Sequence, residues 1–329
     1  MKRLTDDAVA QLVARFRRQR PLRGGSLIVT IFGDALAPRG GAISLGSLIE
    51  LCQPFGLAER LVRTSVSRLA AEDWLAGIKQ GRQAEYRLSA QGRSRFAEAT
   101  ARIYSESNGD WDGQWTLAIV PGARGARGRR IRQRLHWAGF GEPIPGLFLH
   151  ANASLDAACE LLRSQQGAHP EHLEEPVLLR ARSSALPGVL TGSAANGSDH
   201  VLVKAGWELG SVALAYERFQ RAFTPALQRV TELSAHQAFV LRTLLIHDYR
   251  RVHLRDPLLP RWLLPADWPG HAAYELCRAI YRQAFTASEQ HLSSTAATLT
   301  GALPPPAAQT FSRFGGISPA RRSAPARNA

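Results

Sequence analysis

Residues 57–72 read LAERLVRTSVSRLAAE, and this stretch decides the fold of the N-terminal part of the chain. At the helical period of 100° per residue, its aliphatic residues and one serine gather on one side. They are Ala58, Leu61, Val62, Ser65, Val66 and Leu69. The other side carries Arg60, Arg63, Thr64 and Ser67, with Arg68 at its flank. The sequence therefore predicts a helix with one packed face and one face of hydrogen-bond donors.

A face of arginine and hydroxyl groups suits the major groove of DNA. An arginine can donate two hydrogen bonds to a guanine edge, and serine or threonine can reach a base or a phosphate oxygen. Only Glu59 and Glu72, at the two ends of the stretch, carry a charge that DNA would repel. The stretch alone leaves open the more ordinary alternative, a polar face covered only by water.

The segments on both sides of the stretch favour DNA binding. A predicted helix over 46–52 is joined to it by Gln53-Pro54-Phe55-Gly56, a short turn of the kind that links the two helices of a helix-turn-helix. Residues 74–78 and 85–88 then predict two strands of a hairpin, with Gly81 at the bend between them.

The predicted hairpin is cationic. Lys79 and Arg82 lie at its tip, and Arg87 lies on its second strand. We expect these side chains to contact DNA phosphates or the minor groove. The order of three helices, two strands and a further helix from Ser26 to about Tyr104 predicts a winged helix-turn-helix.

The composition of the chain favours a polyanionic partner. Its 329 residues include 41 Lys and Arg against 27 Asp and Glu, a formal net charge of +14. Nucleic acid is the first candidate, ahead of a CoA-type phosphate ligand or an acidic membrane. An arginine-rich composition with no such partner is the alternative.

The cysteines and the hydropathy of the sequence indicate where in the cell the protein is expected. Cys52, Cys159 and Cys277 are widely spaced, which predicts neither a disulfide framework nor a zinc site, and we expect them to be reduced and buried. From its polar first residues we expect no signal peptide, and the sequence contains no apolar run of about 20 residues. We therefore expect a cytoplasmic protein without a membrane partner.

A second domain is predicted from 107 to 184. Strands are expected over 114–120, 146–150 and 176–180, and helices over 125–137 and 154–165. Their order is a split β-α-β pattern, which predicts a small ferredoxin-like domain.

The other parts of the chain are a leader helix over 1–22, a loop over 185–206 and a helical C-terminal domain over 207–290. The predicted C-terminal helices are 207–223, 233–248 and 269–287. Residues 291–329 have too little apolar content to pack and are expected to be a disordered tail. With the winged helix at 23–106, the fold class is predicted to be α+β.

Five stretches resemble the PaaX-type transcriptional repressors of phenylacetic acid catabolism. They are SLIVTIFGD at 26–34, LAERLVRTSVSRL at 57–69, HDYRR at 247–251, LRDPLLP at 254–260 and LPADWPG at 264–270. All are ungapped and in the order expected of the family, and the resemblance covers nearly everything from Ser26 to about Phe285. The loop around 190–199 and the tail after Thr300 depart from the family pattern.

The resemblance implies an architecture and a function. The architecture is a winged helix-turn-helix, a middle ferredoxin-like domain similar to the small CRISPR-integration nucleases, and a helical C-terminal domain. The function is a homodimer that represses transcription on a palindromic operator of double-stranded DNA. The resemblance also implies release by phenylacetyl-CoA or a related aromatic acyl-CoA, and we expect no cofactor beyond this effector.

Two groups of residues are candidates for binding the effector. The first group, on one face of the predicted helix over 125–137, is Arg127, Arg130 and Arg134. It could hold the phosphates of CoA, contact the DNA backbone, or meet only water. The second group, in the stretch 247–251, is Tyr249, Arg250 and Arg251. It could anchor an acyl-CoA or link domains by ion pairs, and the structural role is favoured.

The rival interpretations are a metal-dependent nuclease built on the ferredoxin-like domain and an effector-independent DNA-binding protein. Metal-dependent cleavage needs carboxylates that hold Mg²⁺. The first strand of the middle domain instead ends Ile119-Val120-Pro121-Gly122, and Asp110 and Asp112 come before it. No His-Glu-x-x-His, phosphate-loop or dinucleotide motif occurs, so we predict no enzyme, catalytic residue or metal ligand. A DNA-binding protein without a sensor would leave residues 107–290 unexplained.

Overall fold

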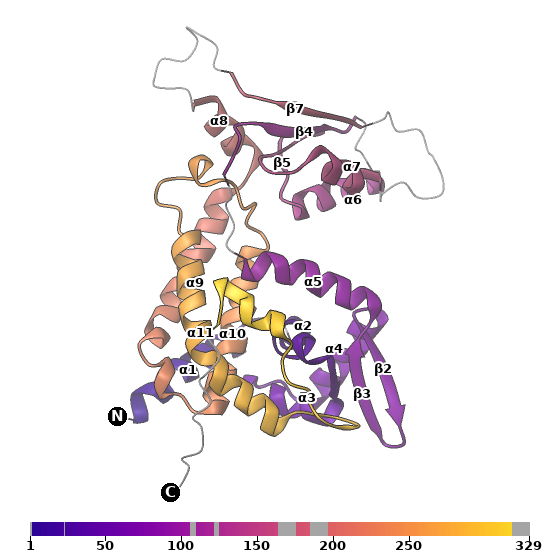
Figure 1. Ribbon diagram of the computed structural model, residues 1–329, viewed down its shortest axis with the longest axis vertical. Helices are drawn as coiled ribbons and strands as arrows, with labels where there is room; N and C mark the ends of the chain where they lie inside the picture. The colour runs from indigo at the N-terminus through magenta and orange to yellow at the C-terminus, as the bar shows by residue number, and fades with distance from the viewer. Residues whose placement is uncertain are drawn as a thin grey trace, which may run out of the picture. The chain divides into compact units, whose positions relative to one another are not determined.

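The computed structural model describes residues 2–22, 24–105, 110–121, 125–163, 176–184 and 197–317. The chain forms two compact units, each assembled from separate stretches (Figure 1). The first unit contains residues 1–106, 216–251 and 271–329, and the second contains 107–215 and 252–270. Helices combined with antiparallel sheets confirm the predicted α+β class. None of the helices in the described ranges is long and apolar enough to cross a membrane.

The N-terminal part of the first unit is a group of helices with a three-stranded sheet. In chain order its elements are α1 (Lys2–Arg17), α2 (Gly24–Thr30), the π-helix η1 (Ile31–Leu36), η2 (Ala37–Arg39), β1 (Ala42–Ser44), α3 (Leu45–Cys52), η3 (Gln53–Phe55), α4 (Glu59–Ala71), β2 (Leu75–Gln80), β3 (Gln83–Leu88) and α5 (Ala90–Tyr104). β3 pairs antiparallel with both β1 and β2, so Tyr86 lies between Ile43 and Gly77. β1 and η1 have no counterpart among the predicted elements.

Local side-chain signals fix the ends of these elements. Ser44 caps α3, because its Oγ accepts a hydrogen bond from the backbone N–H of Ser47 at 3.2 Å. Ser89 caps α5 by accepting from the N–H of Gly92 at 2.8 Å. Gly81 has φ +60° at the first position of the two-residue hairpin turn, a backbone conformation that glycine adopts without strain.

The C-terminal part of the first unit is helical, as the apolar spacing predicts. Its elements are α9 (Leu209–Leu227), η4 (Val230–Glu232), α10 (Ala235–His253) and α11 (Gly270–Thr295). The ends of three of these helices, residues 209–215, 252–253 and 270, are counted with the second unit. α1 packs against α10, because the ring of Phe16 meets that of His247 at a centroid distance of 5.5 Å. The N-terminal and C-terminal stretches therefore share one core.

A buried carboxylate joins these stretches. Asp34 in η1 is 4 % exposed and accepts hydrogen bonds from two tyrosines, Tyr104 at 2.6 Å and Tyr281 at 2.8 Å. Arg242 Nε donates to it at 2.8 Å and Arg313 Nη1 at 3.0 Å. Burial alone would raise the pKa of Asp34, but the two guanidinium groups and the two hydroxyl groups outweigh it and lower the pKa below its ordinary value. Asp34 is therefore an ionised, fully paired group inside the core.

The C-terminal segment corrects the prediction of a disordered tail over 291–329. α11 continues to Thr295, and residues 296–317 fold back over the first unit. Their elements are β8 (Ala297–Thr298), β9 (Gly301–Ala302) and the 3₁₀ segment η6 (Ala308–Gly315). We call residues 296–317 the C-terminal strap. Residues 318–329 lie outside the described residues.

The strap packs through a few well-placed groups. Phe314 is fully buried, and Leu303 and Ile317 are buried with it. The N–H of Ala297 donates to Ser47 Oγ at 3.0 Å, and the N–H of Ala307 donates to the carbonyl oxygen of Pro38 at 2.8 Å. A low average apolar content does not prevent packing when these few apolar residues are all buried.

The second unit is built on a four-stranded antiparallel sheet. Its elements are β4 (Trp115–Ile119), α6 (Gly125–Trp137), β5 (Gly141–Ile144), β6 (Leu147–His150), α7 (Leu155–Arg163), β7 (Val177–Ala181), α8 (Gly197–Gly206) and η5 (Arg261–Leu263). The strand order is β5-β6-β4-β7, and α6 and α7 each connect two strands that are not neighbours (Figure 1). This order confirms the predicted ferredoxin-like domain, in which β5 is an additional, unpredicted strand.

The two faces of this sheet are packed differently. α6 and α7 cover one face, whose core contains Ala118, Val120, Ile131, Leu135, Phe140, Phe148 and Ala158. On the other face Trp115 and Leu149 pack with Val203 of α8 and with apolar residues from 259–264. The predicted loop over 185–206 is therefore wrong for residues 197–206, which form the helix α8 and bury Val203 against the sheet. Residues 185–196 lie outside the described residues.

Candidate nucleic-acid interface

Helix α4 buries one side and exposes the other. Val62 and Val66 are fully buried where α4 packs on α2 and α3, and Ser65 and Leu69 are also buried. The exposed residues are Arg60, Arg63, Thr64, Ser67 and Arg68. Ala58 was placed on the packed side by the periodicity, but it precedes the helix as its N-cap and is exposed.

Two exposed arginines of α4 are paired with glutamates one turn away. Arg63 Nη2 lies 2.7 Å from Glu59 Oε1, and Arg68 Nε lies 2.7 Å from Glu72 Oε1. The hydrogen bond to Glu72 raises the pKa of Arg68. Water screens pairs of this kind on an exposed helix surface, so they contribute little to stability. DNA phosphates or base edges can therefore replace the two glutamates at low cost.

Thr64 and Arg60 differ in what they offer a partner. Thr64 Oγ1 donates to the backbone carbonyl of Arg60 at 2.9 Å, so its hydroxyl hydrogen is used inside the helix. Towards DNA, Thr64 presents an acceptor oxygen and a methyl group, not the donor that its residue type suggests. The guanidinium of Arg60 has no ion-pair partner in the part of the chain that the structure describes.

The β2–β3 hairpin presents three cations. Lys79 and Arg82 are exposed at its tip, and neither forms an ion pair with a described residue. Arg87 Nη2 donates to Glu85 at 2.7 Å, and Glu85 is only 4 % exposed. The N–H of Leu299 in the strap donates to the other Glu85 oxygen at 2.9 Å, and this bond together with Arg87 lowers the pKa of Glu85. The strap therefore holds Arg87 in place through Glu85.

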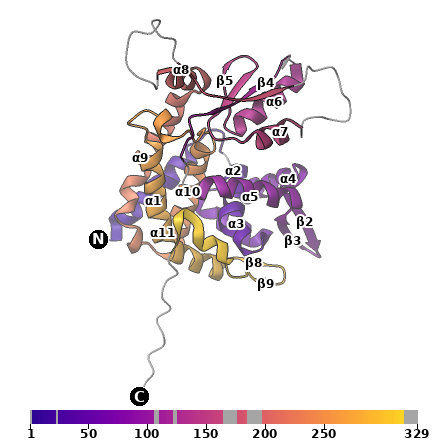
Figure 2. The same ribbon diagram turned by 45° about the horizontal axis from the view of Figure 1, so that its top comes forward.

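These side chains belong to one part of the first unit. α4 contacts β2, and the hairpin stands beside α4 in both views (Figures 1 and 2). The predicted DNA-binding residues are all exposed there, and they are Arg60, Arg63, Thr64, Ser67, Arg68, Lys79, Arg82 and Arg87. The arrangement can present hydrogen-bonding groups and positive charge to a polyanion.

The arginine candidates for effector binding lie on α6 in the second unit. Arg130 and Arg134 are exposed, and the side chain of Arg127 lies outside the described residues. Their neighbour Arg132 has a different role, because its Nε donates to Glu142 at 2.7 Å. Exposed and without a carboxylate partner among the described residues, Arg130 and Arg134 remain able to bind a phosphate group.

The candidates in the stretch 247–251 are largely committed to internal contacts. Tyr249 is fully buried and packs on Phe219 at a ring-centroid distance of 5.5 Å. Arg250 donates to Thr30 Oγ1 at 2.8 Å and to the carbonyl oxygen of Ser26 at 2.7 Å. Burial, with a contribution from Arg251, lowers the pKa of Arg250 to about 10. This stretch therefore ties α10 to α2.

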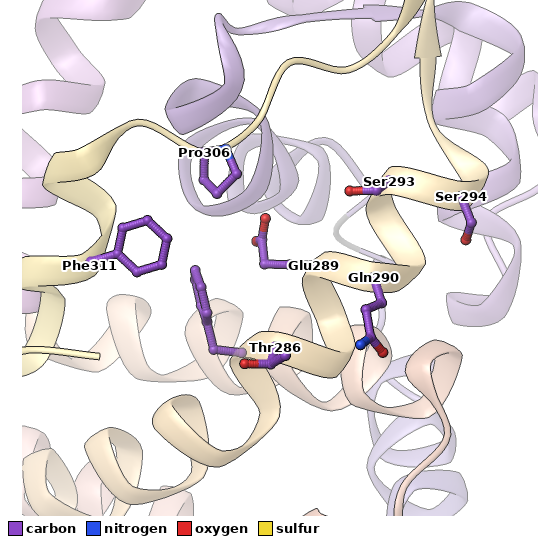
Figure 3. Close-up of a pocket in the computed structure, with 8 residues that line it drawn as sticks. Thr286, Glu289, Gln290, Ser293, Ser294, Pro306 and Phe311 are labelled. Carbon is purple, nitrogen blue, oxygen red and sulfur yellow. The ribbon is translucent and has the colours of Figure 1, made fainter. Parts of the chain in front are cut away.

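A cavity of about 550 Å³ opens between α11 and the strap in the first unit (Figure 3). Phe285 and Phe311 form its aromatic part, with a ring-centroid distance of 5.7 Å. Glu289 also lines it, but Arg39 and Arg242 already bind the Glu289 carboxylate. None of the predicted effector-binding residues whose side chains the structure describes lines this cavity.

Sequence analysis did not identify the buried charges of the first unit. Asp34 follows the apolar run 27–32, and Arg242 interrupts the apolar run 238–246. A charged residue inside such a run is a signal for a buried pair, because a buried charge needs a partner. Arg313 lies in a polar segment and gives no comparable signal.

The described residues can also be compared with the requirements of a metal site and of a reactive cysteine. Within the described ranges, no group of three or more His, Cys, Asp or Glu side chains is placed to hold a metal ion. Cys52 and Cys277 are buried free thiols as expected, whereas Cys159 is half-buried. Burial raises the pKa of Cys52 to about 12, so this thiol is unreactive at neutral pH.

Three family models match the chain in succession. They are described as PaaX-like protein over 23–92, PaaX protein central Cas2-like domain over 108–175 and PaaX-like protein C-terminal domain over 207–294. A transcriptional repressor PaaX from Escherichia coli (strain K12) is 36% identical over 302 residues, 91% of this chain and 92% of that protein. Among solved structures, the uncharacterized protein Rv0674 from Mycobacterium tuberculosis aligns with a TM-score of 0.43 and 24% identity, covering 74% of this chain and 90% of that chain.

Proposed function

The chain belongs to the PaaX-like protein family, and we propose that it represses transcription by binding double-stranded DNA through α4. The members of this family are transcriptional regulators, so the chain is a regulator and not an enzyme. Binding to a chromosomal operator implies a cytoplasmic location. The 36% identity to a named repressor supports this function across nearly the whole chain.

We assign the DNA-binding part as a winged helix-turn-helix within residues 23–106. α2, α3 and α4 are its three helices, and η3 is the turn that precedes the recognition helix. The β2–β3 hairpin is the wing, and β1 completes the sheet by pairing with β3. The predicted middle domain over 107–184 is part of the second unit, which also contains residues 185–215 and 252–270. Of the predicted helical C-terminal domain over 207–290, residues 216–251 and 271–290 belong to the first unit, together with the strap.

The exposed face of α4 carries this assignment. Its arginine and hydroxyl side chains face outward while Val62 and Val66 are fully buried, which is how a recognition helix is held in the major groove. Arg63 is the candidate for reading a guanine edge, since Glu59 holds it only by an exposed pair. Lys79, Arg82 and Arg87 would contact phosphates or the minor groove.

The operator is proposed to be palindromic and bound by a homodimer. Two copies of α4 separated by about one turn of DNA, ~34 Å, would read two half-sites together. This part of the proposal rests on the family resemblance and on the presence of one α4 in each chain.

Release by an aromatic acyl-CoA, phenylacetyl-CoA first, is the sensing half of the proposal. Arg127, Arg130 and Arg134 are favoured as phosphate ligands, because Tyr249 and Arg250 would have to leave their internal contacts and Arg251 adjoins them. A coupling of about 3 kcal/mol would weaken DNA binding roughly a hundredfold. Unchanged DNA affinity on addition of phenylacetyl-CoA would remove this half and leave DNA binding standing.

Arg63→Ala tests the DNA-binding half. The probe is a duplex that the full-length protein itself selects from a random-sequence library, with a scrambled duplex of equal length as reference. If Arg63 reads a base, the substitution costs about 1–3 kcal/mol on the selected duplex, roughly fivefold to 150-fold in affinity, and less on the scrambled one. Fluorescence anisotropy titrations measure both.

The matched control is Arg221→Ala, which removes an exposed arginine from α9 and should leave both affinities unchanged. Equal losses on the two duplexes would reduce Arg63 to a phosphate contact. Failure of the wild-type protein to enrich any sequence would refute the proposed function.

A further inference from the structure

The basic end of α1 has no role in the function proposed so far. The run Arg15-Phe16-Arg17-Arg18-Gln19-Arg20 precedes residues 23–92, which the first family model matches. Arg15 is paired with Asp248 and lies over the ring of Phe223. Arg17, Arg18 and Arg20 are exposed, and none of the three has a carboxylate partner among the residues described. The last residue of α1 and the turn after it therefore carry three exposed arginines that no described carboxylate pairs with.

α1 is fixed to the first unit by its other side. Val9, Leu12 and Phe16 are buried at helical spacing, and the ring of Phe16 meets that of Phe55 in η3 at 6.3 Å between centroids. The pair between Arg15 and Asp248 adds a second attachment, to α10. Arg17 therefore stands on an anchored helix, and Arg18 and Arg20 follow in the turn directly after it.

The same attachment places Arg17 beside the start of α4. Arg17 Nη2 donates to the carbonyl oxygen of Pro54 at 3.0 Å, in the turn that precedes α4. Its side chain also covers Gly56, where an added Cβ would lie 2.5 Å from Arg17 Nε. At the start of α2, Gly24 lies against Leu61 of α4, because a Cβ added at this glycine would lie 3.2 Å from Leu61 Cδ2. Arg17 therefore lies beside the turn that leads into α4 and Gly24 lies beside its first turn, and Arg18 and Arg20 come between these two contacts in the sequence.

This position matters because the N-terminal end of a recognition helix is the end that reaches the bases. The DNA phosphates on either side of that end then lie near the groups that border it. Arginine binds phosphate through two parallel hydrogen bonds. The nearest acidic residue of α4, Glu59, is already paired with Arg63. We propose that Arg17, Arg18 and Arg20 bind DNA backbone phosphates next to the site of α4, which adds affinity without sequence preference.

The inference rests on the proposed function, since it needs DNA at α4. Arg18→Gln with Arg20→Gln removes two charges and leaves the contact of Arg17 with Pro54 in place. A glutamine at 20 retains a donor for the carbonyl oxygen of Arg17, which Arg20 Nη1 meets at 2.7 Å. The affinities of the double variant and of the wild type for the selected and the scrambled duplex are measured at a series of salt concentrations.

Each phosphate contact contributes about −0.9 to the slope of log K against log salt, so losing two in each protomer makes the slope less negative by about 1.8 per protomer and by about 3.6 for a bound dimer. With equal affinities at 1 M salt, this corresponds at 0.15 M to an affinity loss of roughly 30-fold per protomer, equal on the selected and the scrambled duplex. Arg18→Lys with Arg20→Lys keeps both charges and should keep the wild-type slope. Arg221→Gln is the control for a loss of charge elsewhere.

An unchanged slope in the Gln variant overturns the inference, and because the slope does not depend on the fraction of active protein, partial misfolding cannot imitate that result. A loss confined to the selected duplex also overturns it, because phosphates carry no sequence. If Arg63→Ala weakens binding and the Gln variant does not, only this inference fails. If the wild-type protein selects no sequence, the proposed function fails with it.

Discussion

Asp34 connects four elements of the first unit through one carboxylate. Its partners come from α5, α10, α11 and η6, and all of them are buried. The partners are Tyr104, Arg242, Tyr281 and Arg313. The two arginines are tolerated in the core because this carboxylate, together with Glu289 for Arg242, compensates them.

Asp34→Asn should therefore destabilise the protein strongly. The amide has nearly the same shape but no charge, so Arg242 and Arg313 lose compensation inside the core. Removing one partner of a buried ion pair costs about 3–5 kcal/mol. Urea unfolding measures this cost, and Asp110→Asn, at an exposed position, is the control. A free energy of unfolding within 0.5 kcal/mol of the wild type, a range typical of surface substitutions, would contradict the role given to Asp34.

The pH dependence of this cost follows from the lowered pKa of Asp34. A carboxylate whose pKa falls on folding contributes stability above its unfolded pKa of about 3.9 and loses it as the pH drops through the folded value. The difference in unfolding free energy between wild type and Asp34→Asn should be constant between about pH 5 and 7. It should shrink below about pH 4. A difference that grows on acidification would show that Asp34 is protonated in the folded state.

At the scale of single elements, the strap behaves as part of the core. Phe314 is fully buried against Tyr104 and Tyr281, at ring-centroid distances of 5.1 Å in both cases. Phe311, three residues earlier, is only half-buried and meets Phe285. Phe314→Ala should cost about 3–5 kcal/mol in urea unfolding, and Phe311→Ala clearly less. Equal and small losses would mean that the strap is not packed in solution.

The contrast between α4 and the strap explains what local sequence can predict. The two faces of α4 follow from helical spacing within 16 residues, and burial agrees with that spacing except at Ala58. The strap is held by partners more than 200 residues away, such as Asp34 for Arg313 and Glu85 for Leu299. Such contacts leave no periodicity in the segment itself. Its few apolar residues therefore indicated disorder.

The π-helix η1 and the short strands show the same limit. η1 carries Asp34 within an apolar stretch whose composition is that of an ordinary helix, and its wider turn depends on tertiary packing. β1 and β5 have only three and four residues; β1 pairs with the distant strand β3, and β5 pairs with β6, which follows it across a short turn. Strands that short lack the alternation on which a prediction depends.

At the scale of the whole molecule, the order of elements was more predictable than their grouping. The ferredoxin-like topology follows from strands and helices that are close in sequence, and the structure has it. The compact first unit, by contrast, joins residues 1–106 with 216–251 and 271–329. Its buried charges provide a physical reason, because Asp34 in the first stretch is compensated by Arg242 in the second and Arg313 in the third.

The DNA-binding residues were predictable for a different reason. A surface that meets a large polyanion has to display its cations, so exposure, charge and helical spacing coincide at Arg60 and Arg63. The effector site has no such signature. Exposed arginines on α6 and buried residues on α10 are equally consistent with other roles, and the candidates there stay predictions.

The position of α4 on DNA is the central claim, and a tethered cleavage reagent tests it most directly. Ser67→Cys places a thiol in the middle of the exposed face of α4, and Thr224→Cys places one on the exposed side of α9 as the control. Both proteins are labelled with an iron chelate that cuts DNA within its reach, beside labelled wild type to account for Cys159. Cuts inside the selected motif with Ser67→Cys, and none with Thr224→Cys, are the expected result. Binding without any cut from Ser67→Cys, or cuts equal to those of the control, would contradict the claim that α4 reads DNA.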